Sequence, residues 1–141
     1  MPDVLPDSST PFGRQVRDRL ASESVIWFTS VGRDGTPQPN PVWFLWEDGS
    51  ILVYNASGAN RIDHVRRRPR VSLHFNSTNG GGIAVLTGTA EVADAEPPAD
   101  QHEAYLAKYA DGMSQVSGSP AAFATTYSVP IRVRPTNIRG H

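Results

Sequence analysis

Residues 51–75 constrain the fold of this chain more than any other stretch, because they combine two strand patterns with a short basic helix. The letters ILVYNASGANRIDHVRRRPRVSLHF predict a strand, a turn of small residues, a helix, a proline and a second strand. Asn60 and Arg61 open the helix, so free backbone N–H groups, the positive end of the helix dipole and a guanidinium are expected together. The pattern indicates a phosphate site. A plain surface helix with solvated arginines also fits these residues.

The positive charges of the chain are concentrated at this same helix. The 141 residues include 13 basic and 14 acidic ones, which gives a formal net charge of −1. Five arginines nevertheless fall between positions 61 and 70. A nearly neutral chain with one basic segment is expected to bind a local anion, and its charge argues against a general nucleic-acid or membrane-surface binder.

Length and composition predict a single domain. Residues 1–11 carry Pro and Ser and are expected to form a flexible arm, and residues 12–141 are expected to form the domain. No apolar run approaches the ~20 residues of a membrane span, and the first ten residues are unlike a signal peptide. The absence of cysteine excludes disulfides and thiolate ligands. These features predict a cytoplasmic protein.

Hairpin signals dominate the rest of the chain. Strands are expected at residues 25–31, 38–46, 51–55, 71–75, 83–93 and 128–135, and further helices at 12–20, 99–110 and 120–126. Gly88 is expected to mark a bulge, and Arg132 and Arg134 to point outward from the last strand. Six strands joined mainly as hairpins predict a mainly β fold, an antiparallel barrel with peripheral helices. The alternative is an α+β sandwich in which the basic helix is a right-handed crossover.

Three alternating prolines distinguish the second strand. Pro37, Pro39 and Pro41 have no N–H, so this segment is expected at a sheet edge or a bulge. We expect interrupted pairing to leave main-chain groups free to face a ligand, with Trp43 as a flat wall beside them. Trp43 and Trp46 could instead be ordinary core or interface aromatics.

The order of these signals resembles a known family. A hydrophobic strand ending in Tyr54-Asn55, a small turn, Asn60-Arg61, seven residues and then PRVSL from Pro69 is similar to the split-barrel flavoproteins of the pyridoxamine 5'-phosphate oxidase family. The closer resemblance is to the actinobacterial branch that uses the deazaflavin coenzyme F-420, and it runs from about residue 20 to the C-terminus. It implies a six-stranded split β-barrel of the FMN-binding type.

The resemblance also implies where a cofactor would bind. In the family, the turn and the two residues that open the helix hold the cofactor phosphate, commonly through an Arg-Lys pair, and the strand that here carries residues 40–43 contacts the ring. Here the pair is Asn60-Arg61, so the first basic group is replaced by an amide. The expected cofactor-binding residues are Asn40, Pro41, Val42, Trp43, Asn55, Ala56, Ser57, Asn60, Arg61 and Arg66.

The function implied by the resemblance is that of an oxidoreductase. Coenzyme F-420, or FMN as the alternative, would transfer a hydride to or from a small conjugated substrate, and oxidation of pyridoxamine phosphate itself is not expected. The run from Arg66 to Arg68 could hold the poly-glutamate tail of F-420, which FMN lacks. The family forms homodimers with cofactor sites at the interface, so a homodimer is expected. No residue is assigned as catalytic.

Two other classes of function stay open. Related barrels bind haem or its breakdown products, so the chain could be a non-catalytic flavin- or tetrapyrrole-binding protein. A nucleic-acid module would need a broader basic face than a net charge of −1 suggests. The four histidines show no paired spacing with carboxylates, so no metal site is expected. His74, on the outward face of its strand, could be an ordinary polar position or could line the cleft.

Overall fold

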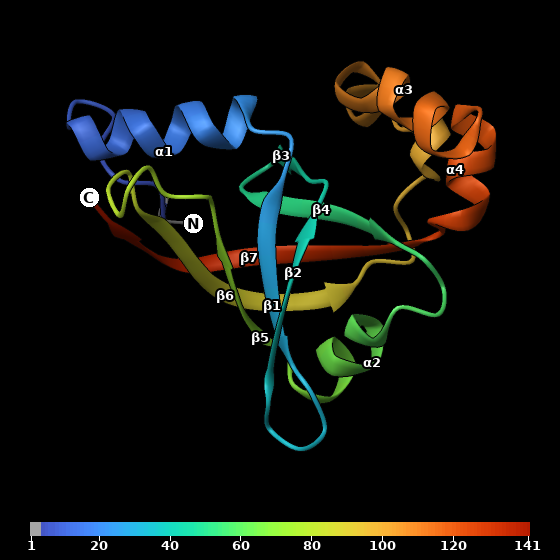
Figure 1. Ribbon diagram of the computed structural model, residues 1–141, viewed down its shortest axis with the longest axis horizontal. Helices are drawn as coiled ribbons and strands as arrows, with labels where there is room; N and C mark the ends of the chain where they lie inside the picture. The colour runs from blue at the N-terminus through green and yellow to red at the C-terminus, as the bar shows by residue number, and fades with distance from the viewer. Residues whose placement is uncertain (1–3) are drawn as a thin grey trace.

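The fold is mainly β and is built on one antiparallel sheet of seven strands that curls into a half-barrel (Figure 1). This computed structural model describes residues 4–141. The strands are β1 (Ile26–Val31), β2 (Pro37–Val42), β3 (Leu45–Glu47), β4 (Ser50–Asn55), β5 (Arg70–His74), β6 (Ala84–Val92) and β7 (Val129–Gly140). Their order across the sheet is β2-β1-β5-β6-β7-β4-β3. Every neighbouring pair is antiparallel, which excludes a crossover between parallel strands.

Helices cover both ends of this sheet (Figure 1). They are α1 (Pro11–Ser22), α2 (Asn60–Arg67), the short 3-10 helix η1 (Ala99–Gln101), α3 (Glu103–Ser117) and α4 (Pro120–Thr126). We call η1, α3 and α4 the helical lobe. Helix α1 begins where the Thr10 hydroxyl accepts the N–H of Gly13, and it buries Val16 and Leu20 as its spacing predicts. Of the expected arm, Leu5 packs against the core and the Pro6 carbonyl accepts from Arg17, while residues 1–3 lie outside the described part.

The expected count of six strands is wrong, because the stretch from 38 to 46 forms two strands. Strand β2 pairs with β1 and β3 pairs with β4, and Phe44 lies between them. The Phe44 N–H donates to the Tyr109 hydroxyl, 2.9 Å away, and its carbonyl accepts from the same hydroxyl at 2.9 Å. Since the Phe44 backbone bonds to α3, the chain leaves one strand pair there and joins another.

Strand β7 also differs from expectation. It extends to Gly140, well beyond residue 135, and pairs with β6. The register of this pair shifts between Thr87 and Gly88, which confirms the bulge expected at Gly88. A Cβ on Gly88 would lie 2.1 Å from the Arg134 carbonyl oxygen, so only glycine fits. Arg134 is exposed as expected, whereas Arg132 is buried with 8% of its surface exposed.

Two apolar clusters hold these elements together. The first fills the concave side of the sheet and includes Phe28, Leu73 and Ile131. The second lies between the sheet and the helical lobe and is rich in tyrosine, with Tyr54 and Tyr105 at its centre. The lobe therefore packs on the sheet through aromatic rings. No helix of the described residues is long and apolar enough to cross a membrane.

Candidate ligand-binding groove

The end of β4 carries a fixed amide that orients an arginine. Asn55 is 1% exposed, and its side-chain N–H groups donate to the carbonyls of Val53 and Val129, both at 3.0 Å. Both donors are used on the sheet, so the amide oxygen faces the other way and accepts from Arg61 Nε at 2.7 Å. Asn55 thus holds the Arg61 guanidinium beside the turn that precedes α2.

Unused donors converge at this point. Burial lowers the pKa of the Arg61 guanidinium, but arginine stays charged in proteins. Its terminal nitrogens have no partner among residues 4–141, and neither do the backbone N–H groups of Asn60 and Arg61. The N-cap residue Ala59 has no side chain that could accept them. A half-buried cation and two free N–H groups at a helix N-terminus form an anion-binding arrangement.

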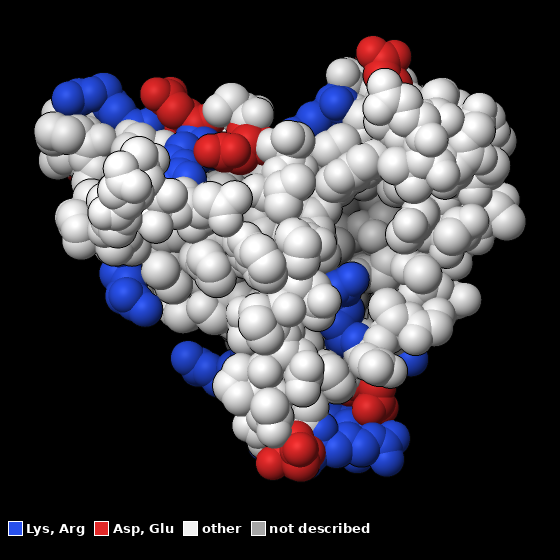
Figure 2. Space-filling model, viewed as in Figure 1, with Lys and Arg blue, Asp and Glu red and all other residues white. Residues whose placement is uncertain are grey.

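Two cavities meet at Arg61 and Ala59. The aromatic cavity, of about 280 Å³, lies between the sheet and the helical lobe, and the polar cavity, of about 450 Å³, lies between β2 and α2. The aromatic cavity is lined by Pro41, Trp43, Tyr54, Tyr105, Phe123 and Tyr127, among others. The polar cavity is lined by Ser30, Gln38, Asn40, Asn60 and His64. Figure 2 shows the surface hollowed between sheet and lobe, with basic side chains inside the hollow.

Trp43 lines the aromatic cavity and also packs in the second core. Its indole stacks on Tyr109 at 4.7 Å and on Phe123 at 5.4 Å between ring centroids. Trp43 is therefore a packed aromatic that also lines a cavity, and its contact with a ligand stays a prediction, while Trp46 packs against the core of the half-barrel. Burial raises the pKa of the Tyr54 and Tyr105 phenols, so these groups stay protonated in the cavity.

The backbone of β2 offers a ligand fewer donors than expected. All six of its residues pair with β1, so the prolines do not interrupt the ladder. Only Gln38, Asn40 and Val42 have N–H groups to make that ladder, so these must point towards β1. The outer edge then carries proline carbonyls alone, as an edge strand should. The next N–H along the chain, that of Trp43, has no partner among the described residues.

Most of the expected cofactor residues come together. Eight of the ten line the two cavities: Asn40, Pro41, Val42, Trp43, Asn55, Ala56, Asn60 and Arg61. Ser57 is exposed in the turn and lines neither cavity. Arg66 is exposed on another side of α2, where it borders a separate hollow near Glu91.

The arginine run is partly used within the protein. Arg67 Nε pairs with Asp63 at 3.1 Å, and Asp63 also pairs with Arg33 at 3.2 Å. Arg68 donates to the Arg33 carbonyl at 3.3 Å. Arg66 is the member of the run with no recorded partner in residues 4–141.

Sequence reasoning missed the wall contributed by the helical lobe and the floor of the polar cavity. The wall from the helical lobe consists of Tyr105, Phe123 and Tyr127. At the floor of the polar cavity, His64 Nδ1 lies 2.8 Å from the hydroxyl of Ser30, which is 1% exposed. The amphipathic spacing of α3 predicts buried aromatics but cannot separate a core ring from a cavity wall.

His74, which could have lined the cleft, stacks instead on Trp27 at 6.1 Å between ring centroids, beside a different hollow. Among residues 4–141 no three His, Cys, Asp or Glu side chains are placed to hold a metal.

Comparison with known proteins identifies the fold. A family model described as Pyridoxamine 5'-phosphate oxidase matches residues 12–138, and no curated protein matches the chain. A candidate pyridoxamine 5'-phosphate oxidase from Listeria innocua is 20% identical with a TM-score of 0.64, over 89% of this chain and 94% of that one. An F-420 reductase is 21% identical with a TM-score of 0.66, over 87% and 94%. HutZ, described as the heme storage protein of Vibrio cholerae, is 11% identical with a TM-score of 0.65, over 93% and 95%.

Proposed function

The chain belongs to the pyridoxamine 5'-phosphate oxidase family, and from this premise we propose that its groove binds coenzyme F-420, with FMN as the alternative. We propose further that the protein is an oxidoreductase of the actinobacterial deazaflavin branch. The observation that carries the proposal is the position of Arg61, which Asn55 holds at the junction of the aromatic and polar cavities. Two proteins of similar fold support this choice of cofactor class: the F-420 reductase, and a protein from Mesorhizobium loti described as FAD-binding.

The residues present fit each part of such a cofactor. Arg61 and the first N–H groups of α2 would bind the phosphate, and the polar cavity would take the hydroxylated chain beside it. The ring would lie in the aromatic cavity against Trp43, whose N–H is placed to meet an acceptor. The two cavities together fall within the ~300–1,000 Å³ usual for small-molecule sites.

The bound ring would supply hydride transfer, and the protein's own groups would supply position and shielding. The protonated phenol of Tyr105 could donate a hydrogen bond to a ligand, whereas that of Tyr54 donates to the Pro97 carbonyl, and neither can act as a base at neutral pH. The rings of the helical lobe would exclude water from one side of the site. The substrate class that fits such a cavity is a small conjugated organic molecule.

A second copy of the chain would complete the site. We propose a cytoplasmic homodimer with two cofactor sites at its interface, in which the open side of each groove faces the other copy. Support comes from the groove's mouth, where Val116 is 58% exposed at the rim of the aromatic cavity. Light scattering of the purified chain would test this. A monomer at every concentration would refute it.

The decisive experiment is to identify what co-purifies from a host that makes both FMN and F-420, by absorbance spectrum and mass. Titration with each cofactor should show binding, and the reduced cofactor should be consumed with quinones or enones as acceptors. Arg66→Ala should weaken binding of F-420 with a long glutamate tail and leave FMN binding unchanged. If neither cofactor binds at micromolar concentration, the proposal is wrong.

One observation favours a second function, that of a non-catalytic flavin- or tetrapyrrole-binding protein. The aromatic cavity is lined by no carboxylate, and its only charged lining group is Arg61. A likeness to a protein described as a heme storage protein is compatible with this reading. A binder would show affinity without consumption of reduced cofactor, whereas the oxidoreductase would show both.

A further inference from the structure

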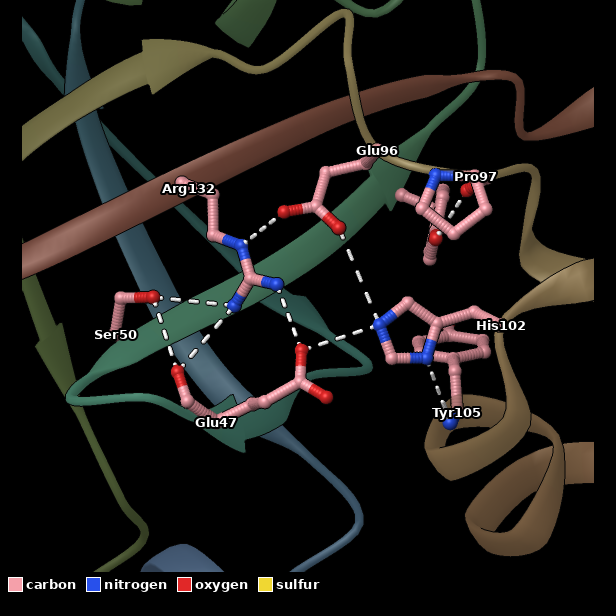
Figure 3. Close-up of polar contacts among 8 residues, drawn as sticks. Glu47, Ser50, Glu96, Pro97, His102, Tyr105 and Arg132 are labelled. Atoms are coloured by element: carbon pink, nitrogen blue, oxygen red, sulfur yellow. Dashed lines mark hydrogen bonds and ion pairs between the residues drawn. The ribbon is translucent and has the colours of Figure 1, made fainter.

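Four ionisable side chains meet where the sheet passes beneath the helical lobe (Figure 3). They are Arg132 from β7, Glu47 from β3, Glu96 from the loop after β6 and His102, which precedes α3; we call them the junction cluster. Arg132 Nε donates to Glu96 at 2.6 Å, and its Nη2 donates to Glu47 at 2.7 Å. Its Nη1 donates to the Ser50 hydroxyl at 3.1 Å. A buried guanidinium with all its nitrogens bonded holds both carboxylates in place.

His102 connects this cluster to the helical lobe. Its Nδ1 accepts the N–H of Tyr105 at 3.3 Å and so caps α3. A nitrogen that accepts carries no proton, so the neutral ring carries its proton on Nε2. Nε2 lies 3.1 Å from Glu47 Oε1 and donates to it. One buried imidazole therefore joins the start of α3 to the turn between β3 and β4.

The same helix turn forms the wall of the aromatic cavity. Tyr105 lies three residues after His102, and its ring meets the Tyr54 ring edge to face at 4.8 Å. The Tyr54 hydroxyl donates to the Pro97 carbonyl at 2.6 Å, just before η1. Both tyrosines line the cavity. The junction cluster thus lies directly behind the two rings that the ligand would contact.

The lobe has a second attachment farther along α3. The Tyr109 hydroxyl bonds to the Phe44 backbone, and Lys108 Nζ donates to the Phe44 carbonyl at 2.9 Å. These contacts would persist if the bond between His102 and Glu47 were lost. The lobe could then pivot at Tyr109, and the start of α3 would move relative to the sheet. That movement would change the width of the aromatic cavity.

We propose that His102 is a positioning residue for the ring end of the ligand, because its bond to Glu47 sets the width of the aromatic cavity. The inference rests on the proposed function only for the nature of the ligand. The phosphate end would be bound by Arg61, which Asn55 orients through a bond that involves no member of the junction cluster. Loss of the bond should weaken binding through the ring and leave the contribution of the phosphate intact.

Two conservative variants separate the two bonds of His102. In His102→Asn the amide oxygen can take the place of Nδ1 and cap α3, but the side chain is too short to reach Glu47. In His102→Gln the amide nitrogen can take the place of Nε2 and donate to Glu47, while the cap is lost. Glu103→Gln, an exposed neighbour in the first turn of α3, is the matched control.

The first measurement is the affinity of FMN and of riboflavin, which lacks the phosphate, for the full-length chain. His102→Asn should weaken both by about fivefold or more, with an unchanged ratio between them, because fewer molecules hold the competent cavity. His102→Gln and Glu103→Gln should bind both within about twofold of the wild type. Equal losses in His102→Asn and His102→Gln, or a loss that depends on the phosphate, would overturn the inference.

The second measurement needs no ligand. Hydrogen exchange should be faster in α4 and in the part of α3 before Tyr109 in His102→Asn, whereas in His102→Gln only the first turn of α3 should exchange faster. If the wild type binds neither flavin and exchange still separates the variants in this way, FMN is excluded as the cofactor and the positioning role of His102 stands. Exchange in α4 that is unchanged in His102→Asn would overturn it.

Discussion

Replacement of Arg61 by alanine tests the candidate phosphate site most directly. The side chain is half-buried, its Nε is bonded to Asn55 at 2.7 Å, and its two terminal nitrogens face the junction of the cavities. Arg61→Ala removes both of these donors but leaves the backbone N–H groups of α2 in place. The variant should therefore retain weak binding and lose the part that depends on the guanidinium.

The size of the loss follows from the number of bonds. A hydrogen bond to a charged group contributes ~1.5–3 kcal/mol when partly buried, and two bonds from one guanidinium share a single ordering cost. Because Arg61 is only half-buried, we expect its two bonds together to contribute no more than one such bond, about 1.5–3 kcal/mol of binding free energy. That corresponds to a dissociation constant raised roughly 10- to 150-fold.

The assay is the ratio of FMN to riboflavin affinity, measured by quenching of flavin fluorescence. The wild type should prefer FMN, Arg61→Ala should lose that preference, and riboflavin binding should change little. Arg66→Ala, which removes an exposed arginine from the same helix, is the matched control and should keep the wild-type ratio. An unchanged ratio in Arg61→Ala would remove the guanidinium from the phosphate site.

Three further substitutions test the packing around the groove. Burial lowers the pKa of Lys108 to about 8, so between pH ~8 and ~10.5 the unfolded chain binds more protons than the folded chain. The unfolding free energy of the wild type, measured in urea, should therefore rise with pH across that range relative to that of Lys108→Met. In Gly112→Ala the new Cβ would lie 2.9 Å from Trp43 Cη2, so flavin affinity should fall several-fold, although alanine is the better helix former. Arg132→Met would leave Glu96 without its arginine and Glu47 with His102 alone, and should cost about 3 kcal/mol of unfolding free energy in urea, whereas Arg134→Met should stay within ~0.5 kcal/mol.

Local signals in the sequence predicted the elements that depend on local chemistry. Helix α4 begins at Pro120, the expected residue, and α1 begins at Pro11, one residue before its expected start. The alternating prolines placed β2 at the edge of the sheet, because only an edge tolerates so many missing donors. The split between β2 and β3 had no local signal. It depends on Phe44 bonding to Tyr109, 65 residues away.

The candidate site divides in the same way. The residues expected to hold a phosphate all lie between positions 55 and 61, so a local pattern could indicate this end of the site, and the phosphate itself stays a prediction. Its ring end takes Tyr105 and Phe123 from helices whose spacing also suits an ordinary core. The buried cation Arg132 was expected to be exposed, because strand alternation indicates the face of a sheet but not whether a lobe covers it.

Helix geometry separates the two arginines that the sequence placed in one site. At 3.6 residues per turn, Arg66 lies about 140° around α2 from Arg61. Ile62 and Val65 are the buried residues of this helix, so they define the side that faces the sheet. Arg61 and Arg66 lie on opposite borders of that side, Arg61 next to Val65 and Arg66 next to Ile62. Arg61 reaches Asn55, whereas Arg66 is exposed near a separate hollow. A long anionic tail could reach Arg66 only by passing around the helix, so the phosphate and the tail of one ligand would contact two separate surfaces of α2.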